Sequence, residues 1–465
     1  MSSTKKGAKV SSTLPTTGQI EKMKLWLTTL SAALCLQVNA SELKLDNNLA
    51  YNLTDSLTVE VGQRLAGSEA DARAVAWAEQ KFKQLGYDKV WTEPFTMQYW
   101  QRGQASLSVS APFHQNLVVT ALGGSIGTPF DGINAQVAMF DSLEQLKQAD
   151  PAQVKDKIVF INKSMGKDKL GTFYGSVVGA RAQGAVEAAK LGAKAIIIRS
   201  VGTSINRFAH TGIMRYSEEV PRIPAAAISV PDAIQLEKML SRQPELTLQL
   251  QMQNKLPGEV VSHNVIAEIT GSKRPDEIVL ISAHIDSWDE GTGALDAGAG
   301  VGIVMATGAL LKQQGRPERT VRVVLFGNEE GGLVGARAYA AKHASNLKNH
   351  VFASESDFGA GRIWRLDTGF GAKSLAFGKT LQQQLAQLGI ELGDNSASGG
   401  PDVSVLKAQG VPVVSLQQDG TDYFDYHHTP NDTMDKIDPA AMQQNLEAWL
   451  ITTRAVANSS VDLRQ

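Results

Sequence analysis

The spacing of apolar and polar positions divides the chain into stretches of different texture. Near the N-terminus, Ser68 can cap a helix whose apolar positions fall three or four residues apart, and Gly86 ends this helix. A strand is predicted at 90–95. In the middle of the chain, short apolar runs alternate with Ala-rich or amphipathic segments, which predict strands at 157–161, 195–198 and 223–228 and helices at 182–191 and 232–239.

From residue 262 onward, the pattern alternates regularly between strand and helix. The predicted strands are 264–269, 277–282, 320–326, 350–356 and 411–416, and the predicted helices are about 298–314 and 332–343. Such alternation is typical of an α/β fold, in which helices cover both faces of a sheet. The middle block contains no acidic or histidine cluster and therefore reads as a separate module.

The N-terminal segment has the features of an export signal. Residues 1–22 are polar, and the basic residue Lys24 then precedes an apolar run at 25–36 that is too short to span a bilayer. Small residues before Ala40 predict cleavage after it. We expect translation to begin at Met23, and we expect an exported protein, periplasmic or secreted, without a membrane anchor.

Composition narrows the functional class. The 465 residues are 43% hydrophobic and 20% charged, which indicates a globular protein long enough for two domains. A net charge of −2 gives no basic field for nucleic acid. The single cysteine, Cys35, excludes an intrachain disulfide or a Cys-rich zinc site, and it leaves with the signal. Lipidation of Cys35 is the alternative, which the bulky Leu34 disfavours.

Histidines and carboxylates gather where the predicted strands end. Ligands bind beyond the carboxyl ends of strands in an open α/β sheet, so these residues should share one site. Imidazole and carboxylate ligands suit a hydrolytic metal centre, and the candidate ligands are His284, Asp296, Glu330, Asp357 and His428. Five ligands serve two ions if one carboxylate bridges them, which leaves Glu329 as the general base.

The order of these motifs resembles the co-catalytic zinc aminopeptidase and glutamate carboxypeptidase family, in particular its plasma glutamate carboxypeptidase-like (carboxypeptidase Q-like) branch. The resemblance covers about residues 45–455. It implies a zinc-exopeptidase α/β fold with a mixed, mainly parallel sheet, interrupted by a protease-associated domain. The predicted parts are the extension and signal peptide (1–40), the first part of the peptidase domain (41–123), the protease-associated insert (124–257) and the catalytic part (258–465).

The resemblance also implies a role for each candidate residue. Two zinc ions would be bound per chain, with Asp296 as the bridging ligand and His284, Glu330, Asp357 and His428 as the others. Asp286 would orient His284, and Glu329 would be the base. His427 would hydrogen-bond the oxyanion. The chain departs from the family pattern at Ala297, where many members carry a polar residue.

The predicted substrate contacts are weaker than the predicted ligands. Tyr423, Tyr426 and Asp402 are candidates for contact with substrate. No cluster of Arg in the sequence marks a pocket for acidic substrates, so the preferred side chain stays open, as does the choice between aminopeptidase, dipeptidase and carboxypeptidase action. The expected partner is a peptide substrate, with a homodimer as an assembly that the resemblance implies.

We therefore interpret the chain as an exported di-zinc exopeptidase that hydrolyses dipeptides or short peptides with a free N-terminus. Two alternatives stay open. One is a zinc deacylase or glutaminyl-cyclase-like enzyme on the same fold, and the other is a catalytically silent binding protein. Taken singly, the candidate residues also fit ordinary roles, such as a helix N-cap for Asp296 or acidic helix-start residues for Glu329 and Glu330.

Overall fold

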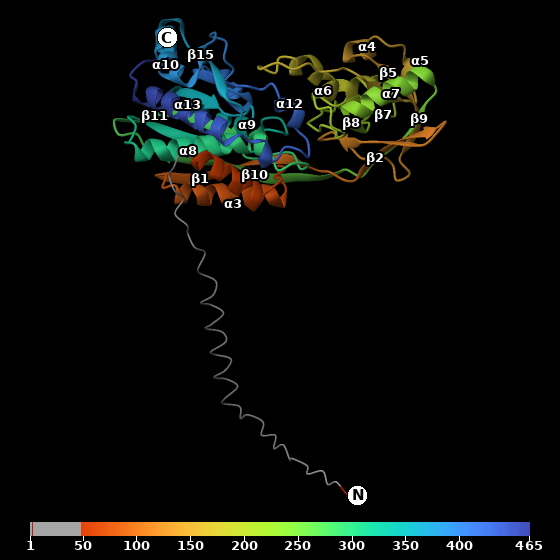
Figure 1. The fold of residues 1–465 in the computed structure, drawn as a ribbon, viewed down its shortest axis with the longest axis horizontal. Helices are drawn as coiled ribbons and strands as arrows, with labels where there is room; N and C mark the ends of the chain where they lie inside the picture. The colour runs from red at the N-terminus through yellow and green to blue at the C-terminus, as the bar shows by residue number, and fades with distance from the viewer. Residues whose placement is uncertain (1, 3–47) are drawn as a thin grey trace. The chain divides into compact units, whose positions relative to one another are not determined.

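Two eight-stranded sheets, each with its own helices, make up the protein in this computed structural model (Figure 1). The structure describes residue 2 and residues 48–465. The predicted signal segment, with Cys35 and the cleavage point after Ala40, lies outside the described residues. Both sheets belong to one compact unit, Lys44–Gln465.

The helix predicted between Ser68 and Gly86 forms as expected. In α3 (Glu69–Gln84), the Ser68 hydroxyl accepts a hydrogen bond from the N–H of Asp71 at 3.2 Å, which caps the helix. One face of α3 is buried through Ala74, Trp77, Ala78 and Phe82. The preceding helix, α2 (Leu49–Glu60), packs on the central helix α8 (Ala299–Gln313) and so joins the core of the first sheet.

The first sheet is mixed and carries the strands that were predicted at 90–95 and from residue 262 onward. Its strand order is β1-β10-β12-β11-β13-β16-β14-β15. The bounds are β1 Lys89–Gln101, β10 Lys255–Ile269, β11 Arg274–His284, β12 Arg319–Phe326, β13 His350–Glu355, β14 Ile363–Gly369, β15 Glu391–Leu392 and β16 Val413–Gln418. The four central strands, β12, β11, β13 and β16, run parallel. Every residue of β12 is buried, as expected for a central strand covered on both faces.

Helices flank this sheet on both faces, as predicted. The α8 helix contacts β11 and β12 together with α13 (Pro439–Asn458). On the other side, α9 (Val334–Lys342) and α11 (Pro401–Lys407) form an apolar cluster with alternate residues of the same strands. The remaining helical segments are η1 Ala294–Gly298, η2 Ala344–Asn349, η3 Ala372–Ser374, α10 Leu375–Leu385, η4 Ala386–Leu388, α12 Tyr423–Tyr426 and η5 Met434–Lys436.

One helical stretch among the described residues is long and apolar enough to cross a membrane. It is Ala294–Gln313, and its most apolar window is wholly buried inside the protein. Its place in the core beside the first sheet therefore explains its apolar composition.

The second sheet is built from the middle of the chain. Its order is β3-β2-β9-β5-β6-β7-β8-β4. The strand bounds are β2 Ala105–Ala111, β3 Gln115–Leu117, β4 Val119–Ala121, β5 Ile133–Phe140, β6 Ile158–Ile161, β7 Ala195–Arg199, β8 Ala225–Ile228 and β9 Thr247–Met252. Helices α4 (Leu143–Lys147), α5 (Pro151–Val154) and α6 (Tyr174–Lys190) pack in one apolar cluster, and α7 (Val230–Arg242) packs in another.

This second sheet begins earlier than the predicted insert. Strands β2 to β4 lie N-terminal to the predicted boundary at residue 124, yet they pair with β9 and β8. The small residues of β2 give only a weak apolar signal, so pairing partners more than 100 residues away decide where it belongs. The insert's identification as a protease-associated domain stays a prediction.

A buried polar network on the first sheet holds a neutral histidine. The Tyr339 hydroxyl accepts from Arg322 at 2.8 Å and lies 2.8 Å from His350 Nε2, to which it can donate. The other ring nitrogen, Nδ1, lies 3.3 Å from the carbonyl oxygen of Asn346. Burial lowers the pKa of His350 to about 3, and the charge of Arg322 adds to this effect.

This histidine predicts that the metal-free protein loses stability in acid. Because the pKa of His350 is lower in the folded than in the unfolded chain, unfolding takes up a proton below pH 6.5. We expect its contribution to lower the free energy of unfolding by on the order of 2 kcal/mol between pH 7 and pH 4. Urea unfolding at both pH values should show that His350→Asn has the smaller pH dependence. The control is His114→Asn, which removes an exposed histidine. If the stability of His350→Asn depended on pH as strongly as that of the wild type and of His114→Asn, this account would be contradicted.

Candidate metal centre

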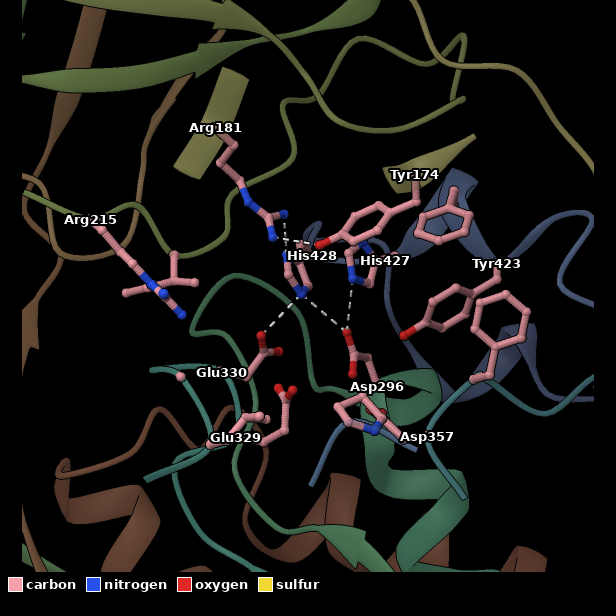
Figure 2. Close-up of a pocket in the computed structure, with 16 residues that line it drawn as sticks. Tyr174, Arg181, Arg215, Asp296, Glu329, Glu330, Asp357, Tyr423, His427 and His428 are labelled. Carbon is pink, nitrogen blue, oxygen red and sulfur yellow. Dashed lines mark hydrogen bonds and ion pairs between the residues drawn. The ribbon is translucent and has the colours of Figure 1, made fainter. Parts of the chain in front are cut away.

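The ends of parallel strands bring the predicted ligands to one edge of the first sheet. His284 is the last residue of β11, and it is paired with Phe326, the last residue of β12. Three residues after Phe326 comes Glu329, and Asp357 follows β13 closely. Figure 2 shows that carboxylates from these loops face the His427–His428 pair, which follows α12.

The first ligand group consists of His284, Asp296 and Asp357. The Nε2 atom of His284 lies 3.1 Å from Oδ1 of Asp296 and 3.0 Å from Oδ1 of Asp357. The three ligand atoms lie within 4.8 Å of one another. This spacing is suitable for three protein ligands around one cation.

The second ligand group shares Asp296 with the first. The Nε2 atom of His428 lies 3.0 Å from Oε2 of Glu330 and 3.3 Å from Oδ2 of Asp296. Asp296 therefore offers one oxygen to each group, as a bridging ligand must. His427 also lies near: its Nε2 atom is 3.6 Å from Oδ2 of Asp296, and Asp296, His427 and His428 form a second compact cluster of ligand atoms.

Poorly satisfied carboxylate oxygens show that the residues fit divalent cations. Oε1 of Glu330 is buried and accepts no hydrogen bond from any of the described residues, and Oδ2 of Asp296 is buried beside two ligand imidazoles at 3.3 and 3.6 Å. A buried carboxylate oxygen without a partner is costly unless a cation balances it. Imidazole nitrogen and carboxylate oxygen are ligands that zinc accepts, so the donor set suits two such ions with Asp296 between them.

The same crowding of charge controls protonation when no cation balances it. Burial raises the pKa of Glu330 and of Asp357, and the charge of Asp296 raises both further. Burial alone would lower the pKa of His428, but the charges of Glu330 and Asp296 raise it to about 9. A cation that binds here therefore displaces protons from the imidazoles.

Asp286 supports the site differently from the prediction. The atom of Asp286 nearest to Nδ1 of His284 is the backbone oxygen, at 3.0 Å, whereas the side-chain oxygen Oδ1 is 3.7 Å away. The Asp286 carboxylate accepts instead from the backbone N–H groups of Glu329 (3.1 Å) and Glu330 (3.3 Å). It therefore fixes the turn that carries the base and a ligand, and its main chain orients His284.

Two buried residues that the sequence did not single out as functional hold the backbone around Asp296 in place. Asp432 accepts from the backbone N–H groups of Leu295 (2.6 Å) and Asp296 (3.2 Å). The buried Arg64 donates to the carbonyl oxygens of Ile285, Thr292 and Gly293. Asp432 lies four residues after His428, whereas Arg64 lies more than 200 residues before Asp296 and had no local signal. The Asp296–Ala297 peptide bond is cis.

Glu329 lies at the cavity wall, where a general base is needed. It shares the turn after β12 with Glu330 but makes no contact with His428 at ion-pair distance. Burial raises the pKa of Glu329 well above 4.5, and the charges of Asp357 and Glu330 add to this, while His284 opposes it. A carboxylate with a raised pKa is suited to accept and return a proton.

The second sheet contributes residues to the cavity that no local pattern indicated. The cavity has a volume of about 420 Å³ and is lined by Tyr174, Arg181 and Arg215 as well as by the carboxylates and histidines (Figure 2). The expectation that no Arg cluster marks a pocket holds for the linear sequence only, because the fold places two arginines at the wall of one cavity. Arg215 is exposed and forms no ion pair within residues 48–465.

The three predicted substrate contacts lie in different places. Tyr423 lines the cavity, and its hydroxyl points toward Asp296 (Figure 2). Tyr426 lines a neighbouring cavity of about 500 Å³ instead. Asp402 is fully buried and borders neither cavity, and burial and Glu355 raise its pKa well above the usual range. Of the three, only Tyr423 can touch a substrate at the metal ligands.

Comparison with known proteins identifies the family. The model of Peptidase family M28 matches residues 264–453, which contain every predicted ligand. Carboxypeptidase Q from Homo sapiens is 38% identical over 412 residues, which cover 88% of this chain and 86% of that protein. The chain belongs to peptidase family M28. The predicted carboxypeptidase Q-like resemblance and the prediction of a metallopeptidase are thereby confirmed.

Solved structures agree with this M28 assignment. The crystal structure of a peptidase M28 precursor from Shewanella amazonensis has a TM-score of 0.88 and 50% sequence identity, and the match covers 92% of this chain and 96% of that one. A zinc aminopeptidase from Bacillus subtilis shares the fold, with a TM-score of 0.66 at 21% identity over 91% of this M28 chain and 98% of its own. The predicted α/β exopeptidase fold is confirmed.

Proposed function

We propose that this M28 protein is an exported exopeptidase with two zinc ions, which hydrolyses dipeptides or short peptides with a free N-terminus. The observation that carries the proposal is the position of Asp296, whose two oxygens serve two separate ligand groups. Glu329 lies at the same cavity without belonging to either group. This separation of base and ligands is what metal-assisted hydrolysis requires.

The residues of the chain divide the work of hydrolysis. When bound, the zinc ions supply Lewis-acid activation of water and of the scissile carbonyl. Glu329 takes the proton from the attacking water, and it returns the proton to the leaving amine. His284, Asp296, Glu330, Asp357 and His428 would hold these ions.

His427 is suited to stabilise negative charge on the reacting oxygen. Burial lowers its pKa well below 6.5, and the neighbouring His428 lowers it further, so the imidazole is neutral. Its Nε2 atom lies on the side of the metal ligands, 3.6 Å from Oδ2 of Asp296 (Figure 2). A neutral ring can donate an N–H at this nitrogen to the oxyanion of the transition state.

The charge of the cavity wall suits a short peptide with two free ends. Glu329, Glu330 and Asp357 line one side and attract the substrate amine, while Arg181 and Arg215 line the side formed by the second sheet. Opposite charges at the two ends of a small cavity favour a zwitterion of matching length. This arrangement supports a dipeptide over a long chain.

The remaining parts of the proposal rest on the sequence. Export to the periplasm or the medium is supported by the signal features of residues 23–40. A homodimer is proposed from the family resemblance. The deacylase, the glutaminyl-cyclase-like enzyme and the silent binding protein become outcomes of the test below.

The test compares one dipeptide with its N-acetylated and C-amidated forms, using zinc-loaded protein. We expect the free dipeptide to be hydrolysed fastest and the N-acetylated form to resist. Equal cleavage of the free and N-acetylated forms would contradict an enzyme that reads the amine and would favour a deacylase. Turnover of none of them would contradict the peptidase and favour the cyclase or the binding protein.

Arg215→Gln should weaken the recognition of the substrate carboxylate. Because this guanidinium has no partner of its own among residues 48–465, its loss should raise KM for the free dipeptide about tenfold and leave kcat nearly unchanged. The C-amidated dipeptide should respond little. The matched control is Arg362→Gln, which removes an exposed arginine from the neighbouring cavity. An equal rise in KM for the free and amidated substrates would refute carboxylate recognition by Arg215.

A further inference from the structure

The second sheet makes backbone contact with the histidine pair. The N–H of Thr211 donates to the carbonyl oxygen of His428 at 3.0 Å. The carbonyl oxygen of Thr211 lies 3.2 Å from Nδ1 of His428. One residue earlier, Nδ1 of His210 lies 2.8 Å from the carbonyl oxygen of His427. Two consecutive residues from the segment of the second sheet, His210 and Thr211, therefore contact two consecutive residues beside the first sheet, His427 and His428.

This contact sets the ring of His428 in the orientation that ligation needs. Its Nε2 atom faces Asp296 and Glu330, while Nδ1 lies 3.2 Å from the Thr211 carbonyl oxygen and 3.4 Å from Nη1 of Arg181. With a cation on Nε2, Nδ1 would carry the proton and donate it to the Thr211 carbonyl, the acceptor of the two neighbours. The backbone of His428 has a φ of 62°, a conformation that a non-glycine residue keeps only when its surroundings hold it. Thr211 is fully buried and supplies part of that support.

Arg102 is the residue that fixes Thr211. It follows β1 directly, and its guanidinium donates to the Thr211 hydroxyl at 3.1 Å. It also donates to the Thr120 hydroxyl and the Ala121 carbonyl in β4, each at 2.8 Å. The Thr211 hydroxyl in turn donates to the same Ala121 carbonyl at 2.9 Å. Thr211 is thus bound to β4 both directly and through Arg102.

The Arg102 guanidinium also binds the loop that follows His284. It donates to Asp289 at 2.8 Å and lies over the ring of Trp288, which contacts the ring of His428 edge to face. Arg102 therefore joins three segments at one point: strand β4, the segment with Thr211 and the loop at 285–290. A planar arginine with several donors can hold such a junction, whereas a single-point cation cannot.

We propose that Arg102 is a positioning residue of the metal centre: it fixes the Thr211 carbonyl that orients His428, so that the second sheet forms part of the ligand scaffold. The inference rests on the proposed function, in which His428 is a ligand. Groups that orient a metal ligand typically change metal affinity by roughly 10- to 100-fold when they are removed. The insert would then serve the metal site itself as well as the cavity wall.

The experiment measures zinc affinity by competition with a chelator, together with the unfolding temperature of the metal-free protein. Arg102→Met should lower the zinc affinity of one of the two sites at least tenfold. Arg102→Lys should keep only part of the lost affinity, and Thr211→Val should lower the affinity of the same site several-fold. The matched control is Arg322→Met. Like Arg102, Arg322 binds a carboxylate and a hydroxyl and lies over a tryptophan, but its partners are Glu268 and Tyr339. The Arg322→Met variant should lose stability but keep the zinc affinity of both sites within twofold of the wild type.

The outcomes separate this inference from the proposed function. If the wild type binds two zinc ions and Arg102→Met binds both as tightly, the positioning role is overturned. The same holds if Arg322→Met loses as much affinity, because general destabilisation then explains the effect. If Arg102→Met does not fold, Thr211→Val decides: weakened binding supports the role and unchanged binding overturns it. A wild type with fewer than two ions overturns the proposed function and this inference with it.

Discussion

Glu329→Gln is expected to lower kcat about 1,000-fold on a free dipeptide while both zinc sites keep their affinity. The amide is nearly the same size as the carboxylate but cannot take a proton from the attacking water. Glu329 lines the cavity and belongs to neither ligand group, so the metal sites should survive the change. Steady-state kinetics and zinc analysis of the same preparation measure the two effects separately.

The neighbouring Glu330 provides a matched control for this prediction. Its Oε2 atom lies 3.0 Å from Nε2 of His428, so Glu330→Gln should weaken zinc binding as well as activity. The assignment of the base would be wrong if Glu329→Gln kept more than a tenth of the wild-type kcat. It would equally be wrong if Glu329→Gln lost zinc as readily as Glu330→Gln.

Asp296→Ala is expected to be the most damaging substitution for metal binding. Its Oδ1 atom lies 3.1 Å from Nε2 of His284 and its Oδ2 atom lies 3.3 Å from Nε2 of His428, so one substitution removes a ligand from both groups. We expect loss of at least one zinc ion and a fall in kcat of at least about 1,000-fold. Zinc content after dialysis, together with kinetics, measures both.

A buried carboxylate outside the cluster distinguishes ligand loss from a damaged fold. Asp367 is buried and binds Arg365 and Gln417, and Asp367→Ala should keep two zinc ions even if it unfolds more easily. Asp357→Ala should lose only the ion of the first group, because Asp357 contacts His284 but not His428. Retention of two tightly bound ions by Asp296→Ala would exclude a bridging role.

The sequence predicted the elements whose signal is local. Helix α3 has its cap, its apolar face and its end in one stretch of sequence, and the structure places it as expected. The apolar runs of β11 and β12 likewise identified the central strands. Strands β2 and β14 were missed because their places depend on partners that lie far away along the chain, β9 in one case and β16 in the other.

The residues of the candidate site likewise divide into those with a local sequence signal and those without one. His284, Asp296, Glu330, Asp357 and His428 follow strand ends or short motifs, and the structure brings all five together. Arg181 and Arg215 were not predicted, because the second sheet must fold against the first before they face the carboxylates. The same is true of Arg102 and Thr211, whose contacts with β4 and His428 cross between the two sheets.

A zinc titration of the metal-free protein, followed by the rate of dipeptide hydrolysis, tests the central claim most directly. The account predicts that two zinc ions bind per chain and that full activity needs the second ion, because Asp296 serves both groups. Full activity with one bound ion would contradict the shared centre and favour a single-zinc enzyme on this fold. Failure to bind zinc at all would contradict the metallopeptidase mechanism itself.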